Sequence, residues 1–563
     1  MVKPLNNKRK DLASLALSVV ILILLNFIGS KLFFRLDLTS ENRYTLSKAT
    51  KQMVEDLDDV VFVRVYLDGD LPAGFKRLRN STKELLDELR AVSSENIQYE
   101  FIDPSADPDQ KVRNDVYRQL SKMGLQYTNL EYMEGDKKLE KIIFPGAMVA
   151  YKNKEIPLQL LKSKIGANPE VMLNNSVQQL EFEIANAIRK LTIDVKPKIA
   201  FIEGQGELKE LDVKDITFEL SQFYNVERIR INQQLDALNN VDAIIIAKPD
   251  SLFDEKDKFI IDQFIMRGGK CLWLIDQLQV NHDSLQKNSF TFAIGRSLNI
   301  DDQLFKYGAR INSDLVLDLQ SSPIPVVLGY IGNQPQQKLF PWYFYPLVIP
   351  ISDNPLVKNL NAVRFQYGSS VDTIAKPGIK KTFLLHSSKY TKMLNSPVRV
   401  SLNILRDEPQ MEQYNKPHVP MAVLLEGEFE SVYKNRLPQN LLENNLIKFK
   451  EKSKATKMIV IGDGDIIRND IVMSTGKPYP LGYDRFSDNI YANKNFILNC
   501  MNYLLDDSGL ISVRGKEIQL RLLDKGKLAK EKAAWQFLNI FIPILLVIVS
   551  AILLFFIRKR KYA

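Results

Sequence analysis

The chain has little cysteine and little histidine for its length. Its 563 residues include two cysteines and three histidines. Cys271 lies in an apolar, strand-like run and Cys500 in a helix-like run, so each is expected to be a small core residue. The absence of a Cys-x-x-Cys pair leaves no site for redox or zinc chemistry. His282, His386 and His418 are the only histidines, so the chain has few side chains suited to general acid-base catalysis. We expect no metal and no cofactor.

Intact nucleotide and nucleophile motifs are also lacking. Gly204-Gln205-Gly206 follows a strand-like run, but a dinucleotide fingerprint needs a small residue where Lys209 stands. No P-loop and no Gly-x-Ser-x-Gly elbow occur. Class I glutamine amidotransferases carry their nucleophilic Cys on a sharp turn after a strand, whereas Cys271 begins or lies inside its strand. We therefore predict no enzymatic activity, and we interpret the Gly-x-Gly as a tight bend from strand to helix.

Charge of one sign is not in excess outside the two ends of the chain. The formal net charge is +9 and the sequence pI is about 9.0. Because the rest of the chain is close to neutral, this charge does not indicate a nucleic-acid partner. Basic residues beside a membrane span are topology signals or contacts to anionic lipid. The terminal basic residues that account for most of the charge are Lys3, Lys8, Arg9, Lys10, Arg558, Lys559, Arg560 and Lys561.

Long apolar runs are present at two places, one near each end of the chain. Residues 12–30 and 533–557 are long enough and apolar enough to be transmembrane helices. We expect tails 1–11 and 558–563 to be cytoplasmic, because basic residues lie tight against the apolar runs. Two spans then place the long middle of the chain on the other side, which predicts an inner-membrane protein with a large periplasmic region.

The first part of this middle region is predicted to be a small α/β layer domain. Over residues 36–192, strand-like and helix-like segments alternate in the order β-α-β-α-β, and a final helix is expected at 176–191. Ser47 is a plausible N-cap for an early helix. The pattern looks like the thioredoxin fold, yet no cysteine occurs before residue 271, which rules out its redox chemistry.

The second part, residues 196–505, reads as a doubly wound α/β domain. Continuous apolar runs at 199–204, 241–249 and 270–276 alternate with helical patterns, as is typical of buried parallel strands. The run at 458–465 has the same character and is placed in the same sheet. The pattern resembles the amidotransferase type of sheet, with residues 321–454 as a β-rich insertion. A juxtamembrane connector is expected at 506–532.

Ligands of open α/β sheets bind beyond the carboxyl ends of the strands, where several acids and glycines of this chain are expected to lie. Paired carboxylates there would suit a divalent cation. The alternative, which we favour, is that these residues are turn and cap residues. The candidate ligand-binding residues are Glu203, Gly204, Gly206, Glu207, Asp276, Asp463 and Asp465.

Two further groups are candidates for docking a partner. The aromatic segment FPWYFYP offers Phe340, Trp342, Tyr343, Phe344 and Tyr345 either as a docking surface or, as we favour, as side chains folded back over a β core. In the last apolar run, polar groups and a kink would mark the face that packs on another helix, although a lipid-tolerant kink is an equal alternative. These residues are Gln536, Asn539 and Pro543.

Several stretches together resemble the GldG family, the gliding-motility-associated component of an ABC-type transport system in Bacteroidota. The stretches include DLTSENRYTLSKAT (37–50), YEFIDPSADP (99–108), IAFIEGQGEL (199–208), FIMRGGKCLWLID (264–276) and LLEGEFESVYKNRLP (424–438). The resemblance spans nearly the whole chain, although no single motif is diagnostic. It implies two partners, a GldA-like ATPase and a multi-spanning, GldF-like permease, but no catalytic residue.

The resulting functional hypothesis is a non-catalytic auxiliary subunit of an ABC-type transport complex linked to gliding motility. Its extracytoplasmic domains would either couple to the nucleotide-driven motion of the transporter or recruit a partner. Its spans would pack on the permease and contact membrane lipid. The alternative is an extracytoplasmic receptor that binds a solute or glycan at the strand ends of the second domain.

Overall fold

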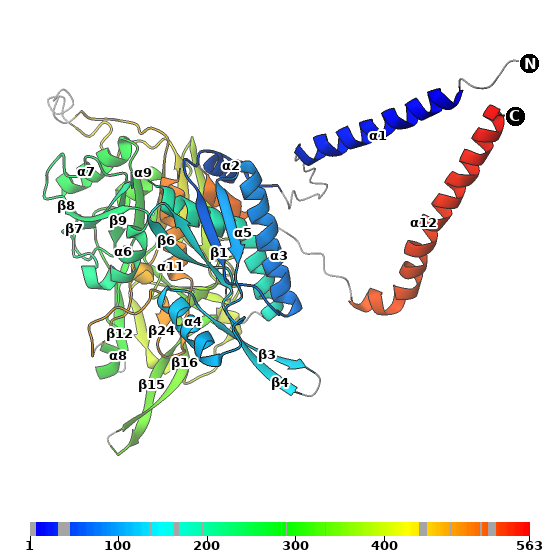
Figure 1. Cartoon of the computed structure of the whole chain (residues 1–563). Coiled ribbons are helices and arrows are strands. Elements are labelled where there is room, and N and C mark those ends of the chain that lie inside the picture. Colours follow the sequence, from blue (N-terminus) through cyan, green and yellow to red (C-terminus); the bar gives the residue numbers. More distant parts are fainter. Residues whose placement is uncertain are drawn as a thin grey trace, which may run out of the picture. The chain divides into compact units, whose positions relative to one another are not determined.

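The computed structural model is a mixed α/β protein, shown in Figure 1. The chain forms two compact units, Met1–Lys516 and Glu517–Ala563, which are described separately. The residues that the structure describes are 7–31, 45–134, 137–162, 168–193, 195–282, 284–288, 290–332, 334–437, 448–472, 474–506, 509–515 and 525–562. The expected start of the first domain at residue 36 and part of the expected 506–532 connector lie outside these ranges.

A four-stranded sheet with the order β2-β1-β5-β6 forms the first α/β region. β1 and β2 are parallel, and the other two pairs are antiparallel. The alternation of apolar residues buries Val61, Val63 and Val65 of β1 in a core with helices α3 and α5. The bounds are α2 Lys48–Glu55, β1 Val61–Val65, α3 Ala73–Val92, β2 Ile97–Phe101, α4 Gln110–Lys122, β5 Gly146–Tyr151, β6 Lys154–Gln159 and α5 Pro169–Thr192.

Local signals in this region are partly as predicted. Ser47 caps α2, because its hydroxyl accepts a hydrogen bond from the Thr50 N–H at 3.1 Å. The sequence pattern did not predict the antiparallel hairpin of β3 (Thr128–Glu134) and β4 (Lys137–Ile143), which interrupts the expected β-α-β-α-β order. Its strands are rich in charged residues, so the hydrophobic period that identifies a half-buried strand is weak there.

A seven-stranded sheet, ordered β19-β22-β23-β10-β9-β7-β8, forms the second region. The five strands from β23 to β8 are parallel, as the continuous apolar runs predicted. β22 is antiparallel to β23, and β19 is antiparallel to β22, so this edge makes the sheet mixed. The bounds are β7 Lys198–Glu203, β8 Asn225–Arg230, β9 Ala243–Ala247, β10 Lys270–Leu274, β19 Ile379–His386, β22 Pro420–Gly427 and β23 Thr456–Ile461.

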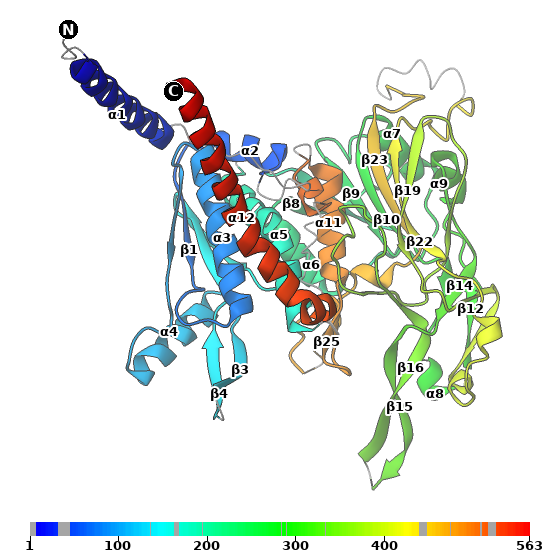
Figure 2. The ribbon, with the colours of Figure 1, turned by 90° about the vertical axis from the view of Figure 1, so that its right-hand side faces the viewer.

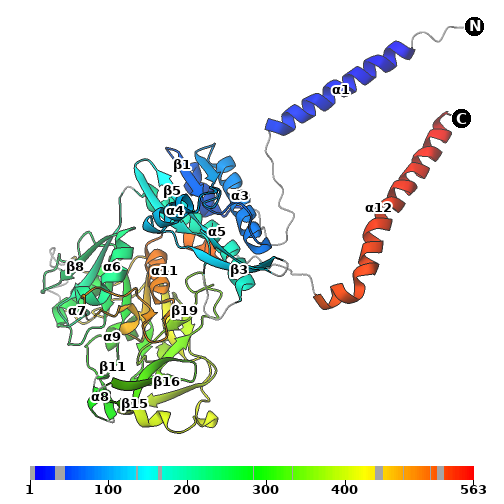
Figure 3. The same cartoon turned by 60° about the horizontal axis from the view of Figure 1, so that its bottom comes forward.

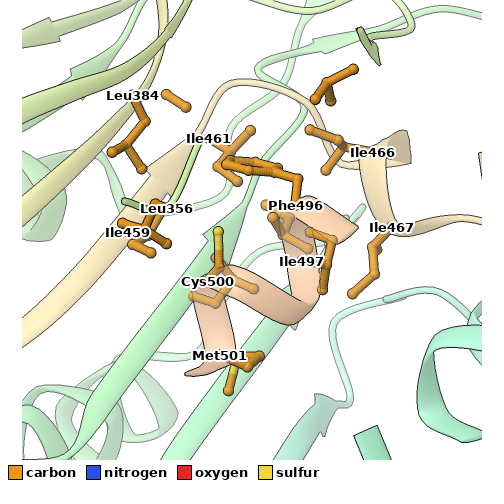
Figure 4. Close-up of a cluster of buried hydrophobic side chains, with 14 of the residues drawn as sticks. Leu356, Leu384, Ile459, Ile461, Ile466, Ile467, Phe496, Ile497, Cys500 and Met501 are labelled. Carbon is orange, nitrogen blue, oxygen red and sulfur yellow. The ribbon is translucent and has the colours of Figure 1, made fainter. Parts of the chain in front are cut away.

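Both faces of this sheet are covered by helices. Side chains alternate along each strand, so Ile244 and Ile246 of β9 face one core while Ile245 faces the other. α7 (Glu255–Met266) and α9 (Asp301–Tyr307) pack on the first face. The opposite face is covered by α6 (Lys214–Ser221) and α11 (Asn493–Leu505); Figure 4 shows the side chains where α11 meets β23.

The two cysteines lie in these two cores. Cys271 of β10 and Cys500 of α11 are fully buried on opposite faces of the sheet, and both are free thiols. Burial raises the pKa of both thiols well above the ordinary value. The prediction that each acts as a small core residue is confirmed.

The segment 321–454 contributes both to the sheet and to a separate β-rich layer. β19 and β22 lie within this segment and extend the central sheet. A long hairpin of β15 (Ser321–Ile331) and β16 (Gln334–Val348) leaves the body of the unit. The remaining elements are η1 Glu210–Val213, β11 Leu278–Gln279, α8 Ser284–Lys287, β12 Phe290–Gly295, β13 Ala309–Ile311, β14 Asp314–Asp318, β17 Val363–Arg364, β18 Val371–Thr373, β20 Thr391–Asn395, β21 Val398–Ser401, η2 Leu402–Leu405, η3 Met411–Gln413, η4 Asp465–Ile467, β24 Tyr483–Asp484, β25 Asn489–Ile490 and η5 Leu510–Gly515.

Helix α5 belongs to both α/β regions. Its Ile184 and Ile188 lie in the core of the four-stranded sheet, whereas Phe182 and Ala185 lie in the core of the seven-stranded sheet. Figure 3 shows this helix between the two regions. Because one helix completes two hydrophobic cores, the two regions form one compact unit rather than two independent bodies.

The terminal helices differ in how well they qualify as membrane spans. Within the described residues, one segment, Ala534–Ile557 of α12 (Lys525–Tyr562), is long and apolar enough to cross a membrane. α1 (Asn7–Lys31) contains the shorter apolar segment Leu15–Leu24. The second expected span is thus supported, whereas the span at residues 12–30 stays a prediction.

Candidate functional site

Charged side chains gather where three neighbouring strands of the central sheet end. Lys248 directly follows β9, Asp276 lies two residues after β10, and Asp463 and Asp465 follow β23. Because these strands are parallel neighbours, their carboxyl ends meet at one edge of the sheet. One carboxylate oxygen from each of the three aspartates lies within 4.8 Å of the other two. These three are among the acids that the sequence pattern placed at the strand ends.

Lys248 holds this acidic group together. Its Nζ lies 3.1 Å from Oδ2 of Asp276 and also bonds Oδ2 of Asp465. Burial lowers the pKa of Lys248, but the two carboxylates outweigh this effect and raise it above its ordinary value. The side chain is therefore a half-buried, charged ammonium that takes the place in which a bound cation would otherwise sit.

Asp463 is the most deeply buried member of the group. It is fully buried, and its two oxygens accept hydrogen bonds from the N–H groups of Gln366 (2.6 Å) and Asp465 (2.7 Å). Burial and then the charges of Asp276 and Asp465 raise its pKa well above the ordinary value. Burial likewise raises the pKa of Asp276, against the lowering effect of Lys248.

Close backbone packing fixes the geometry of the group. The Gly464 N–H donates to Oδ1 of Asp276 at 2.5 Å. A Cβ on Gly464 would lie 2.6 Å from Cβ of Lys248, so only glycine allows this approach without a shift. Arg468 adds a second positive charge 3.5 Å from Asp465. The residues thus satisfy one another and fit a structural ion network at the sheet edge better than an open metal site.

The glycine-rich bend after β7 forms a separate group, because β9 lies between β7 and the strands that carry the aspartates. Glu203 bonds Arg228, and the Glu207 carboxylate accepts the Gln205 N–H at 2.8 Å. Burial raises the pKa of Glu207. Sequence reasoning placed Glu203 and Glu207 at the strand ends with the aspartates as acids that could converge. In the structure they lie at the end of β7 and in the bend that follows it, apart from the aspartates.

Both glycines of the bend have conformations that favour glycine. Gly204 has φ 130° and Gly206 has φ 74°. At Gly206 a Cβ would also lie 1.7 Å from Oδ1 of Asp250. The Leu208 N–H then donates to the Ala247 carbonyl at 3.0 Å, which returns the chain to the end of β9. The interpretation of Gly204-Gln205-Gly206 as a tight bend agrees with this geometry.

Most of the aromatic segment is inside the protein. Trp342, Tyr343, Phe344 and Tyr345 are buried in one core cluster, while Phe340 is half-buried. These four side chains therefore cannot form a docking surface without rearrangement, and of the two interpretations, packing over a β core is the one that the burial supports. His282 completes a polar contact there, with its Nδ1 2.6 Å from the Tyr367 hydroxyl oxygen and 3.3 Å from that of Tyr345.

The polar residues of the last helix share one side of it. Gln536, Asn539 and Pro543 lie three and four residues apart, a spacing that places them along one face of α12. All three are exposed in this unit. The arrangement leaves them as a proposed helix-packing face.

Lys248 is the member of the strand-end group that sequence reasoning missed. The signal was present, because Lys248 directly follows the apolar run AIIIA, as the aspartates follow β10 and β23. Lys248 adds internal ion pairing to the two interpretations of this edge, a cation site and the favoured turn and cap residues.

The stability of the protein should depend on pH through Asp463. Its pKa in the fold is above that in the unfolded chain, so its contribution to stability is full below about pH 4 and is lost as pH rises through the folded pKa, by roughly 1.4 kcal/mol per unit. Asp463→Asn also replaces one of the two accepting oxygens by an amide NH2 group. This group cannot accept the hydrogen bond that the backbone N–H of Gln366 or Asp465 donates to Asp463. We therefore expect this variant to be destabilised more at about pH 5 than at about pH 8, as measured by urea unfolding.

A matched surface variant separates this effect from a general response to pH. The carboxylate of Asp353 is 94% exposed, so Asp353→Asn should show the same small change at both pH values. An equal gap between wild type and Asp463→Asn at pH 5 and at pH 8 would mean that Asp463 is already ionised in the folded state at pH 5.

Comparison with known proteins relates this region to transport. A family model described as an ABC-type uncharacterized transport system matches residues 196–500, which is more than half of the chain. The match begins at β7 and ends in α11, so it covers the central sheet and its strand-end group. A model of a domain of unknown function matches residues 40–150.

Two individual proteins are similar to this chain at low identity. An uncharacterized protein of Borreliella burgdorferi is 23% identical over 576 residues, an alignment that covers 99% of this chain and 100% of that protein. A solved structure, the mmIFT52 N-terminal domain, is 12% identical with a TM-score of 0.30 and covers 57% of this chain and 100% of its own. The alignment with the Borreliella protein thus runs along nearly the whole of both chains.

Proposed function

Since this chain belongs to the ABC-type uncharacterized transport system family, an auxiliary component of ABC transporters, we propose that it is a non-catalytic subunit which couples its folded unit to a permease in the membrane. The family match to the central sheet carries this proposal. The strand-end group supports it, because Lys248 and its aspartates satisfy one another and offer no free nucleophile or open cation position.

The proposed partners are an ABC ATPase, GldA-like, and a multi-spanning permease, GldF-like. ATP hydrolysis would belong to the ATPase, in agreement with the lack of a P-loop in this chain. A role in gliding motility is the narrower form of the proposal and depends on the resemblance to the GldG family.

The proposed topology places both termini in the cytoplasm and the large unit in the periplasm, with the inner membrane crossed at residues 12–30 and 533–557. The apolar segment Ala534–Ile557 supports the second crossing, and the basic residues next to it support a cytoplasmic C-terminus. Gln536, Asn539 and Pro543 are the proposed face toward the permease, because polar groups in lipid tend to find helix partners.

A thioredoxin-like fold is proposed for residues 36–192, and an amidotransferase-like sheet for 196–505. The parallel β1–β2 pair, the antiparallel β5 and β6 and the closing helix α5 support the first. Five parallel strands with helices on both faces support the second. Neither fold brings its usual chemistry, since Cys271 and Cys500 are buried in cores.

Co-purification from native membranes in mild detergent tests the proposed function. We expect the ATPase and the permease to co-purify with the full-length chain. They should be lost when Ala534–Ile557 is replaced by an unrelated apolar helix of equal length that keeps the chain in the membrane. Gln536→Leu with Asn539→Leu is the smaller variant, and should weaken the association without changing membrane insertion.

Two outcomes would count against the proposal. If neither partner appears with the native chain while other membrane complexes stay intact, the chain is not a stable transporter subunit. If both partners remain after the helix is replaced, α12 is not the docking element, and the folded unit or the proposed span at residues 12–30 must carry the contact.

A further inference from the structure

The β15–β16 hairpin forms an arm that extends beyond the body of the unit (Figure 2). Its base is anchored in the protein, because Ile324 and Trp342 are buried in the core. Toward its tip the large side chains are exposed: Leu328 is 63%, Tyr330 71% and Ile331 68% exposed. Exposed apolar groups gathered at the end of a projecting element indicate a contact surface.

The strand register shows how the apolar side chains are arranged on the arm. Directly opposed residues share a face, so Tyr330 lies beside Pro335 and Val327 beside Gln337. Leu328 is the extra residue at a bulge between two registered pairs. Val327, Tyr330 and the exposed Leu339 therefore form an uncharged stripe along one face, and Leu328 adds to it near the tip.

The arm is nearly free of charge. Residues 320–352 contain a single charged side chain, Lys338, in a protein of which 25% is Asp, Glu, Lys or Arg. An ordinary solvated hairpin carries charges on its outer face, so this depletion is specific to the arm. Without acids the arm meets no repulsion from anionic headgroups, and with one lysine it gains little from them.

Prolines prevent the arm from binding a partner by strand addition. Pro323 and Pro325 lie on β15, and Pro335 and Pro341 lie on β16. Each removes a backbone N–H that an added strand would need. The arm is thus suited to contact through its side chains at the tip and along one face, not through its edges.

We infer that the tip of this arm inserts into the interfacial layer of the lipid bilayer to which the chain is anchored. Leu328 and Ile331 enter the boundary of headgroups and acyl chains, a layer that such groups reach by ~5–10 Å. Tyr330 lies at headgroup level, where an aromatic ring with a polar end is favoured. The contact is hydrophobic rather than electrostatic, so it occurs on zwitterionic phospholipid and is insensitive to salt.

A lipid surface fits these features better than a protein partner does. The most exposed apolar side chains of the arm are gathered toward its tip, where a protein contact would bury little area. The arm also carries only one charged side chain, Lys338, and so offers little charge complementarity to a protein partner. The inference rests on the membrane anchoring of the proposed function and adds a second, reversible contact between the folded unit and the same membrane.

A polarity-sensitive fluorophore at the tip tests the inference in the full-length chain. Leu328→Cys is labelled with a thiol-reactive dye and reconstituted in phosphatidylcholine vesicles. The native Cys271 and Cys500 are fully buried, so the wild-type chain should take up no dye and serves as the labelling control. We expect a blue-shifted emission, quenching of at least about twofold by lipid-attached quenchers and little quenching by aqueous iodide, unchanged by salt.

Phe218→Cys is the matched control, because Phe218 is also a large apolar residue and is 65% exposed, but lies on α6 in the body. Its label should be quenched by iodide and not by lipid. Carbonate extraction of the same vesicles reports membrane anchoring separately from the tip contact. If the chain resists extraction and the Leu328→Cys label behaves like the Phe218→Cys label, the inference fails while the anchoring stands.

Addition of the permease gives a further decisive outcome. A Leu328→Cys label that stays exposed in lipid vesicles and becomes shielded only when the permease is present would replace the lipid contact with a protein contact. Shielding in vesicles of lipid alone, at low and high salt, supports the inference as stated.

Discussion

Lys248→Met is expected to lower the free energy of unfolding by about 3–5 kcal/mol, because it leaves the buried carboxylates of Asp276 and Asp465 without their ammonium partner. Methionine is unbranched and of similar length, so it keeps the packing of the lysine stem and adds no clash at the left-handed φ of 56°. Unfolding in urea can be followed by the fluorescence of the buried Trp273 and Trp342.

Two further variants test whether the loss in Lys248→Met comes from the unpaired carboxylates. Lys380 pairs with Glu426 at 3.6 Å, but its side chain is 75% exposed, so Lys380→Met should cost no more than about 1 kcal/mol. Arg468 still faces Asp465 in Lys248→Met, so the carboxylate left without a cation is that of Asp276. Adding Asp276→Asn removes this charge and should recover part of the lost stability. A loss below about 1 kcal/mol for Lys248→Met would show that the aspartates are protonated or hydrated, and the ion-network account would be wrong.

Phe496→Ala should have an equally large effect, a loss of about 3–5 kcal/mol. Phe496 is fully buried where α11 packs on β23, among Ile459, Ile461 and Ile466 (Figure 4). Truncation removes the ring and leaves a cavity between a helix and a strand that are both held by other contacts, so the gap cannot close. The same urea measurement reports this loss.

Conservative and exposed replacements provide the controls for this cavity. Phe496→Leu keeps most of the apolar volume and is expected to cost less than about 1.5 kcal/mol. Phe218→Ala removes the same side chain at a site that is 65% exposed, and should change stability by about 0.5 kcal/mol or less. Equal losses for Phe496→Ala and Phe218→Ala would contradict the packing of α11 on the sheet.

Lys248→Met and Phe496→Ala also bear on function. The ion network and the hydrophobic core that they weaken both lie within the residues of the family match. Marginal folding lowers the abundance of a protein in cells, so a defect in transport caused by Phe496→Ala should follow the amount of folded chain. Gln536→Leu with Asn539→Leu should instead reduce partner association at unchanged abundance. Comparing the two separates loss of folding from loss of coupling.

The strands of the central sheet were predictable because burial on both faces requires continuous apolar runs. Residues of β9 and β10 read as such runs, and the structure places them side by side with β7 and β23. Edge strands lack this constraint. β19 and β22 extend the sheet from within the expected insertion, and their antiparallel pairing follows from chain connections that no local pattern encodes.

The candidate site was predictable in part for the same reason. Three aspartates that each follow a strand were expected to meet, and they do. Lys248 was missed because a basic residue after a strand is usually a solvated end, and only the neighbouring strand ends make it a partner for Asp276 and Asp465. Glu203 and Glu207 were wrongly grouped with them, since strand order cannot be read from strand identity.

The sequence by itself determined which nucleotide, nucleophile and Cys-x-x-Cys motifs are missing, the apolar segment of the last helix and the alternation of strands and helices. These properties depend on residue type and local period, which are present in the chain before it folds. Only the tertiary structure decided that α5 completes two cores, that the aromatic segment is buried and that a lysine balances the aspartates. These properties depend on which distant segments become neighbours, and that choice is set by packing of the whole chain.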